Sequence, residues 1–396
     1  MEYLWAVGVT AIVTAVASWF VLRFARRRQL VHQPRERDMH QDAVPRLGGV
    51  AMFIGLLAGF GGALLLPRFQ NLWQVPSQMW ALFAACTLIA IIGTVDDLFD
   101  LDWMVKLGAQ LAAAGILAWS GIQILSVPFG DTLIVASPTT NLAITVLLTV
   151  LVMNAVNFID GLDGLVAGFA IISNTVFFVY TQILTAQSGE SRSVTLAGLI
   201  AAVVVGMSAG FLPFNWHRAR MFMGDTGALL IGLLMATSTT SVTGQLNPAA
   251  LDQKLVLASY IPIILPFAVL LMPTMDFTLA VIRRVKAGMS PFSADRKHLH
   301  HRLIDYGHSH LQAAFIFHLW TAVISVTCLL VFVLQSFAVP LVVLFVGSVL
   351  CILVTLVPAS RVRDALAQRG LLPLHSSRPR VSDTPQIERT EPQEPS

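Results

Sequence analysis

The stretch AITVLLTVLVMNAVNFIDGLDGLVAG (residues 143–168) places two aspartates inside a segment that otherwise suits hydrocarbon. Residues 143–156 are almost without polarity, and apolar sequence resumes at Leu165. A carboxylate in lipid is costly unless it is paired, binds a metal or faces water. Asp160 and Asp163 therefore predict that one membrane helix ends here, that another begins, and that a polar site lies between them.

The rest of the chain has the composition of a membrane protein. Its 396 residues are 56% hydrophobic and only 12% charged, whereas soluble proteins carry about 25% charged residues. Lone strands would leave backbone groups unpaired in lipid, so the spanning segments must be helical. The sequence predicts an all-α polytopic integral membrane protein with about eleven transmembrane helices, at 4–22, 47–66, 79–95, 105–124, 141–157, 164–184, 193–212, 225–241, 255–275, 312–335 and 339–357.

The basic residues predict the orientation of these spans. Every lysine and arginine falls on one side of the predicted topology except Arg68, Arg192 and Lys254. By the positive-inside rule the crowded side is cytoplasmic. The N-terminus is then outside, and the catalytic loops and the C-terminus are in the cytoplasm. Residues 1–357 form the membrane domain, and the Pro-, Ser- and Glu-rich residues 358–396 are expected to be a largely disordered tail.

The acidic residues gather on the same predicted face. Only Glu2, Asp131, Glu190 and Asp252 fall on the other side. The cytoplasmic acids lie in VDDLFDLD (95–102), FIDGLDG (158–164), FMGDTG (222–227), TMDF (274–277) and SADRKHLHHRL (293–303), each at or near the end of a span. Separate parts of the chain are therefore expected to bring carboxylates together at one membrane surface.

Each acidic motif has a structural alternative when it is taken alone. Asp96 and Asp97 suit a solvated helix end facing Lys106, or a general base beside a metal ligand, because adjacent like charges attract a cation. Asp163 and Asp225 could each cap the helix that follows. The glycines around Asp225 equally suit a helix N-terminus that binds phosphate or a metal–phosphate pair.

The most polar loop supplies cations. It contains His298, His300, His301 and Arg302, without the spacing of a zinc site. Histidines beside Arg and Lys bind phosphate oxygens well, although a loop that merely lies on the membrane surface is the alternative. Many carboxylates and a cationic loop are compatible with a phosphate substrate when Mg²⁺ joins them, with Mn²⁺ as the alternative ion. The pattern favours phosphoryl transfer between a lipid phosphate and a soluble nucleotide-activated group.

VDDLFDL, NFIDGLDGL, FMGDTG and the HLHH loop, in this order, resemble the polyprenyl-phosphate N-acetylhexosamine-1-phosphate transferases. The resemblance covers about residues 34–320. SPFSADRKHLHHRL is similar to the branch that uses UDP-N-acetylglucosamine (UDP-GlcNAc), and PRERDMHQDAVPRLGGVAMF is especially similar to its actinobacterial members. Thr226 and Ala228 depart from the Ser-Gly-Ser often found around the metal aspartate, and Ala294 replaces a common proline.

The resemblance implies roles for particular residues. Asp96 and Asp97 match a paired base and metal ligand, and Asp225 matches a second metal ligand. The residues implied to complete the site are Asp160 and Asp163 as catalytic residues, and Asn157, Lys106, His298, His300, His301 and Arg302 as substrate-binding residues.

The implied reaction transfers GlcNAc-1-phosphate from UDP-GlcNAc to undecaprenyl or decaprenyl phosphate at the cytoplasmic face of a bacterial plasma membrane. UMP is released, and the product starts a cell-envelope polysaccharide. No nucleic acid partner is expected, and a homodimer is left open. The alternatives are the same chemistry with UDP-MurNAc-pentapeptide, and a membrane transporter, for which acids near the bilayer midplane and matching broken helices would be expected.

Overall fold

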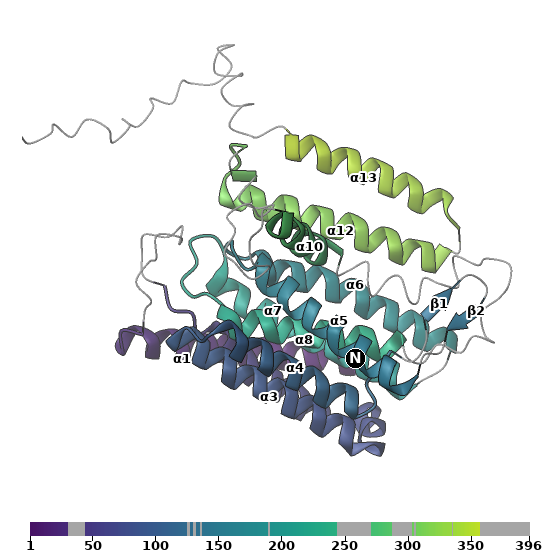
Figure 1. Ribbon diagram of the computed structural model, residues 1–396, viewed down its shortest axis with the longest axis horizontal. Coiled ribbons are helices and arrows are strands. Elements are labelled where there is room, and N and C mark those ends of the chain that lie inside the picture. The colour runs from purple at the N-terminus through teal and green to yellow at the C-terminus, as the bar shows by residue number, and fades with distance from the viewer. Residues whose placement is uncertain are drawn as a thin grey trace, which may run out of the picture.

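The computed structural model describes residues 1–30, 44–124, 127–129, 132–134, 137–188, 191–243, 271–286, 303–304, 306–334 and 336–356. Figure 1 shows that these residues form a bundle of long, roughly aligned helices. In chain order the elements are α1 (Glu2–Arg27), α2 (Gly48–Ala63), the 3-10 helix η1 (Pro67–Gln74), α3 (Pro76–Phe99), α4 (Trp103–Trp119), β1 (Val127–Phe129), β2 (Thr132–Ile134), α5 (Pro138–Ile159), α6 (Leu165–Ser188), α7 (Arg192–Asn215), α8 (Gly224–Thr243), α10 (Leu271–Lys286), α12 (His310–Leu334) and α13 (Ala338–Leu356).

The prediction of a polytopic helical membrane protein is confirmed. Seven helices in the described part of the chain are long and apolar enough to cross a bilayer: α1, α3, α5, α6, α7, α12 and α13. The number rises to eight if α2 and η1, which meet at a bend of 99°, form one broken span. The span predicted at 255–275 lies mostly outside the described residues, and the tail 358–396 lies wholly outside them.

Three connections differ from the prediction. In the first, the expected connection 276–311 begins inside a helix, because α10 continues to Lys286. The expected loop at 67–78 begins with η1, whose first residue is Pro67; proline suits the first position of a helix because the backbone N–H there has no helical partner. Residues 127–129 and 132–134 pair as antiparallel strands with Phe129 opposite Thr132, so the all-α prediction missed two short strands.

Helix α8 lies at the centre of the bundle, packed against α2, α3, α5 and α7. Residues 226–242 are all buried, although the second half of this helix is polar. The hydroxyls of Thr237, Ser238, Thr240 and Ser241 donate to carbonyls about one turn earlier in α8. These hydroxyls therefore need no partner from lipid or water.

The N-terminus of α8 is held by the backbone that leads into α2. The N–H of Gly48 donates to the carbonyl of Phe222 at 3.0 Å, and the N–H of Gly49 donates to that of Met223 at 2.8 Å. A Cβ at Gly49 would lie 2.3 Å from the backbone nitrogen of Gly227. Glycine is required here because two backbones meet at closer range than any side chain allows.

Replacing Gly49 with alanine should lower the free energy of unfolding by about 2 kcal/mol, because the obstructing atoms belong to a backbone that cannot move aside. Gly61 is the matched control in the same helix, since a Cβ there meets nothing within 4 Å. Thermal unfolding of the purified protein should show a lower Tm for Gly49→Ala and an unchanged or slightly higher Tm for Gly61→Ala. Equal Tm values for the two variants would contradict the close approach.

The two ends of the bundle differ. In Figure 1 the N-terminus and the strands β1 and β2 lie at one end, and α13 finishes at the opposite end. The C-terminal ends of α3 and α5 and the N-terminal end of α8 carry the acidic motifs. Hydrogen bonds join these three helix ends in one place.

Candidate active site

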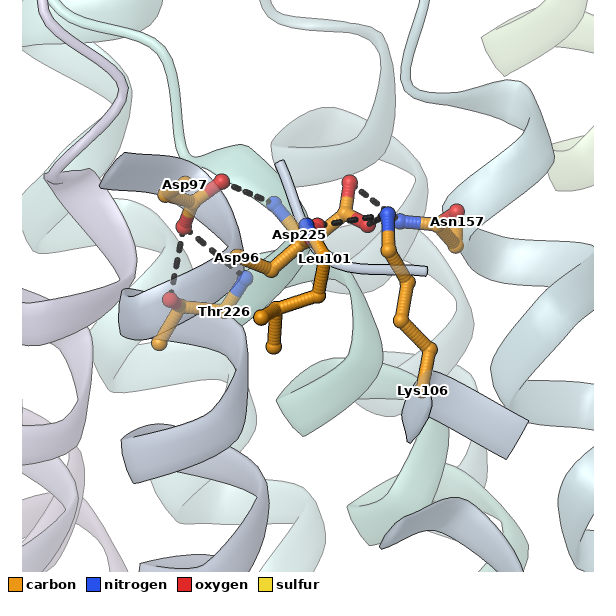
Figure 2. Close-up of polar contacts among 7 residues, drawn as sticks. All are labelled: Asp96, Asp97, Leu101, Lys106, Asn157, Asp225 and Thr226. Atoms are coloured by element: carbon orange, nitrogen blue, oxygen red, sulfur yellow. Dashed lines mark hydrogen bonds and ion pairs between the residues drawn. The ribbon is translucent and has the colours of Figure 1, made fainter. Parts of the chain in front are cut away.

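Asp97, in the last turn of α3, caps the first turn of α8 (Figure 2). Its Oδ1 accepts from the backbone N–H of Asp225 at 2.8 Å. Its Oδ2 accepts from the N–H of Thr226 at 3.2 Å and from the Thr226 hydroxyl at 2.6 Å. The first N–H groups of a helix have no partner within the helix and carry its positive dipole end. One carboxylate thus satisfies the start of the central helix from a different helix.

Gly224 makes this cap sterically accessible. Its φ is +69°, and a Cβ there would lie 2.4 Å from each carboxylate oxygen of Asp97. A positive φ is unfavourable for residues with a side chain. The glycine before Asp225 therefore serves the approach of Asp97 as well as the turn into α8.

Lys106, near the start of α4, joins the carboxylates of α3 and α8. Its Nζ lies 2.6 Å from Oδ2 of Asp96 and 3.1 Å from Oδ2 of Asp225. The other oxygen of Asp96 accepts from the backbone N–H of Leu101 at 2.8 Å. The Asp96 side chain is 6% exposed and that of Asp225 is 30% exposed. Because both carboxylates share the Lys106 ammonium, the repulsion between them is offset.

The contacts of Asp225 decide between its two predicted roles. Its Oδ1 accepts from the side-chain amide of Asn157 at 3.1 Å, and its Oδ2 accepts from Lys106. The carboxylate therefore turns toward α4 and α5, and Asp97 supplies the cap for α8. Figure 2 shows the Asp225 carboxylate beside the ends of the Lys106 and Asn157 side chains. Asp225 is thus a member of the polar cluster, with one of its carboxylate oxygens directed to each of two other helices.

Asp160 directly follows the last residue of α5, and its pKa is affected by the charges of the same cluster. Its pKa is raised to about 8, first by burial and then by the negative charges of Asp225 and Asp97, while Arg46 opposes the rise. The negative charges of Asp225 and Asp97 thus couple Asp160 electrostatically to the acidic cluster.

Asp163 has a different environment. Its Oδ2 accepts from the backbone N–H of Ala219, in the connection between α7 and α8. Asn215 fixes the same region, because its Oδ1 accepts from the N–H of Gly164 and its amide donates to the carbonyl of Met221. Asp163 thus positions the connection that leads into α8.

The two remaining aspartates of VDDLFDLD lie at helix ends. Asp100 ends α3 with φ +54°, and Asp102 caps α4 by accepting from the N–H of Met104 at 2.8 Å. The predicted residues His298, His300, His301 and Arg302 lie outside the described residues.

Three contributors were missed by the sequence analysis. Thr226 was treated only as a departure from a pattern, yet its hydroxyl holds Asp97. Gln110 accepts a hydrogen bond from Asn154 and so ties α4 to α5. Arg46 lies close enough to Asp160 to lower its pKa. The pair Gly48 and Gly49, which follows Arg46 after one residue, was the available signal, since paired glycines often mark a close backbone approach.

The donor set suits a hard divalent cation. Asp96, Asp225, Asp160 and Asn157 offer carboxylate and amide oxygens, which Mg²⁺ prefers over sulfur or imidazole ligands. Within the described part of the chain, no three His, Cys, Asp or Glu side chains are already arranged around a common metal position. The Lys106 ammonium lies between two of these carboxylates instead. The residues therefore fit such an ion by charge and ligand type.

The raised pKa of Asp160 predicts how stability depends on pH. The folded protein keeps a proton on Asp160 up to about pH 8, whereas the unfolded chain loses it near its ordinary pKa of about 4. The stability that this proton contributes is complete below about pH 4 and is lost as the pH rises through about 8. In EDTA, Asp160→Asn should flatten the fall of Tm between pH 5 and 9, whereas Glu2→Gln at the far end of α1 should not. Parallel curves for wild type and Asp160→Asn would contradict the assignment.

Fold and site together define an integral membrane protein with a cluster of carboxylates, joined by Lys106, where its helices end. The profile of glycosyl transferase family 4 matches residues 79–243. Decaprenyl-phosphate N-acetylglucosaminephosphotransferase of Mycolicibacterium smegmatis is 39% identical over 81% of this chain and 80% of its own length. A probable undecaprenyl-phosphate N-acetylglucosaminyl 1-phosphate transferase of Bacillus subtilis is 32% identical over 81% and 82%, respectively. The chain therefore belongs to the polyprenyl-phosphate N-acetylhexosamine-1-phosphate transferases.

Proposed function

We propose that this protein transfers GlcNAc-1-phosphate from UDP-GlcNAc to a polyprenyl phosphate and releases UMP. The observation that carries the proposal is the convergence of Asp96, Lys106, Asn157 and Asp225 from four helices. The names of the similar proteins agree with it, since each joins a polyprenyl phosphate to an N-acetylglucosamine phosphate. The product, polyprenyl-pyrophosphoryl-GlcNAc, would be the first lipid-linked intermediate of a cell-envelope polysaccharide.

The reaction is a direct displacement at phosphorus. An oxygen of the lipid phosphate attacks the β-phosphorus of UDP-GlcNAc, the bond from that phosphorus to the bridging oxygen breaks, and the electron pair leaves with UMP. A phosphate monoester is largely dianionic near neutral pH because its second pKa is about 6. Holding the two phosphorylated substrates in line is then the main task of the protein.

The described residues divide this work. Asp225 and Asp160 face the cluster as metal-binding carboxylates, and Asn157 fixes the orientation of Asp225. Lys106 contributes positive charge beside the phosphates. The base and metal-ligand roles of Asp97 stay predictions, to which its contacts add the positioning of α8. Asp163 acts through the connection that it holds.

Mg²⁺ would be held by Asp225 with Asp160 and Asp96, and Mn²⁺ is the alternative ion. When bound, it would neutralise the phosphate oxygens as charge develops on the leaving UMP. The cationic loop with His298, His300, His301 and Arg302 would contribute further positive charge to the pyrophosphate.

The remaining parts of the proposal concern topology. We place the site on the cytoplasmic face of a bacterial plasma membrane, with about eleven spans and the N-terminus outside. The basic ends of α1 and α10 support this orientation: Arg26 and Arg27 lie in the last turn of α1, and Arg283, Arg284 and Lys286 in that of α10. A homodimer stays a prediction.

Membranes containing the protein should convert radiolabelled UDP-GlcNAc and polyprenyl phosphate into UMP and a butanol-soluble labelled lipid. A parallel incubation with UDP-MurNAc-pentapeptide tests the alternative sugar. Product from the second donor alone would overturn the sugar assignment, and uptake of substrate without any chemical product would favour a transporter.

A further inference from the structure

A basic cavity lies at the C-terminal end of α1, apart from the residues of the acidic cluster. Its volume is about 380 Å³. Among the described residues, four of the seven that line it are arginines and none is acidic: Arg23, Arg26, Arg27 and Arg220, with Trp19, Leu22 and Phe214 completing the wall. A concave surface with this much positive charge predicts an anionic ligand.

Helix geometry concentrates the charge on one side of α1. Five residues of this helix line the cavity, at positions 19, 22, 23, 26 and 27. Because they recur at intervals of three and four residues, they lie on one face of the helix. Arg23 and Arg27 lie four residues apart on α1, and like charges at that spacing repel each other. An anion bound between them would remove this repulsion.

The fourth arginine comes from another part of the chain and is held in place. The backbone N–H of Arg220 donates to the carbonyl of Phe214 at 2.9 Å. Its Nη2 donates to the carbonyl of Pro213 at 3.0 Å, and its guanidinium lies 5.2 Å from the centre of the Phe214 ring. The side chain is therefore fixed against the end of α7, so less rotamer entropy is lost when a ligand binds.

The wall of the cavity is amphipathic. Trp19, Leu22 and Phe214 lie beside the arginines, and the guanidinium of Arg23 lies 5.6 Å from the centre of the Trp19 ring. Tryptophan and arginine together are typical of the interface where a membrane helix leaves the hydrocarbon. A free phosphate would use only the arginines, whereas a lipid would also contact the apolar side chains with its glycerol and acyl groups.

We propose that this cavity binds the phosphate headgroup of an anionic glycerophospholipid. Guanidinium groups pair with phosphate oxygens in a fork geometry, so four arginines suit such a headgroup. Basic pockets between transmembrane helices on the cytoplasmic side bind anionic lipids in this way. The site is separate from the transfer reaction, and its failure would leave the proposed function unaffected.

The test uses the purified full-length protein in a neutral detergent. It is titrated with dioctanoyl-phosphatidylglycerol, dioctanoyl-phosphatidylcholine or inorganic phosphate, and Kd is measured by calorimetry. Phosphatidylglycerol should bind at least about tenfold more tightly than either of the others. Arg27→Gln should weaken it about fivefold, as expected for one interfacial arginine, and Arg23→Gln/Arg26→Gln/Arg27→Gln should weaken it far more.

Arg28→Gln is the matched control. Arg28 directly follows the last residue of α1, it is also exposed, and its guanidinium lies against Phe24 rather than in the cavity. Its variant should bind phosphatidylglycerol within about twofold of wild type, since its charge lies outside the site. Equal losses for Arg27→Gln and Arg28→Gln would overturn the proposal in favour of general surface attraction. Equal affinity for phosphatidylcholine, or for inorganic phosphate, would overturn the assignment to an anionic lipid.

Discussion

Replacing Asp225 with asparagine should slow UMP release by about a thousandfold, even when Mg²⁺ is saturating. The substitution keeps the size of the side chain and removes only its charge. In the native protein that charge meets Lys106 at 3.1 Å and the amide of Asn157 at 3.1 Å. The neutral amide would lose the attraction to Lys106 and to a metal ion while α8 stays capped by Asp97.

The control for this variant is another aspartate of the same predicted membrane face. Asp102→Asn makes the same chemical change at the exposed cap of α4, where the side chain accepts from the backbone N–H of Met104. Its rate should stay within about threefold of wild type, because a cap contributes about 1 kcal/mol to helix stability and touches no substrate. Rates of UMP release are measured for both variants over a series of Mg²⁺ concentrations. Near wild-type rates for Asp225→Asn at low as well as high Mg²⁺ would rule out its ligand role.

Asp97→Ala should both destabilise the protein and abolish most of its activity. Three hydrogen bonds to α8 are lost at once, and the buried N–H groups of Asp225 and Thr226 lose this acceptor. A buried donor without a partner costs about 1 to 3 kcal/mol, so the free energy of unfolding should fall by about 3 kcal/mol. The rate should fall by at least about a hundredfold, since Asp225 is the second residue of the helix that Asp97 caps.

Two milder variants separate positioning from direct chemistry. Thr226→Val removes the hydroxyl that donates to Asp97, together with its longer contact of 3.4 Å to the Thr94 hydroxyl, and leaves the Asp97 carboxylate in place. If Asp97 acts by fixing α8, Thr226→Val should lose part of both stability and kcat, and Thr226→Ser should restore them. If Asp97 acts as a base or metal ligand, Thr226→Val should keep its kcat while Asp97→Asn loses it. Thermal unfolding and UMP release on the same preparations decide between the two outcomes.

Helix positions could be predicted well from the sequence because a membrane span is a local property. A run of about 20 apolar residues suffices to cross the hydrocarbon, whatever the rest of the chain does. Local signals also marked some of the ends, as with the aspartates near helix termini. The strands β1 and β2 escaped because two strands of three residues leave almost no periodic pattern.

The roles of individual aspartates could not be predicted in the same way. VDDLFDLD contains four carboxylates, yet Asp96 meets Lys106, Asp97 caps α8, Asp100 ends α3 and Asp102 caps α4. Their spacing gives the direction of each side chain around its own helix. It does not say which other helix lies in that direction.

The sequence by itself determined a helical membrane protein with acidic residues at one end of its spans, because burial in lipid selects apolar runs one segment at a time. Only the tertiary structure decided that Asp160 is coupled to the acidic cluster and that Asp163 holds the connection before α8. It also brought Asp97 to Thr226 and Arg220 to the arginines of α1. These pairings depend on how helices distant in sequence rotate and pack, and that arrangement is fixed by contacts between the helices rather than within any one of them.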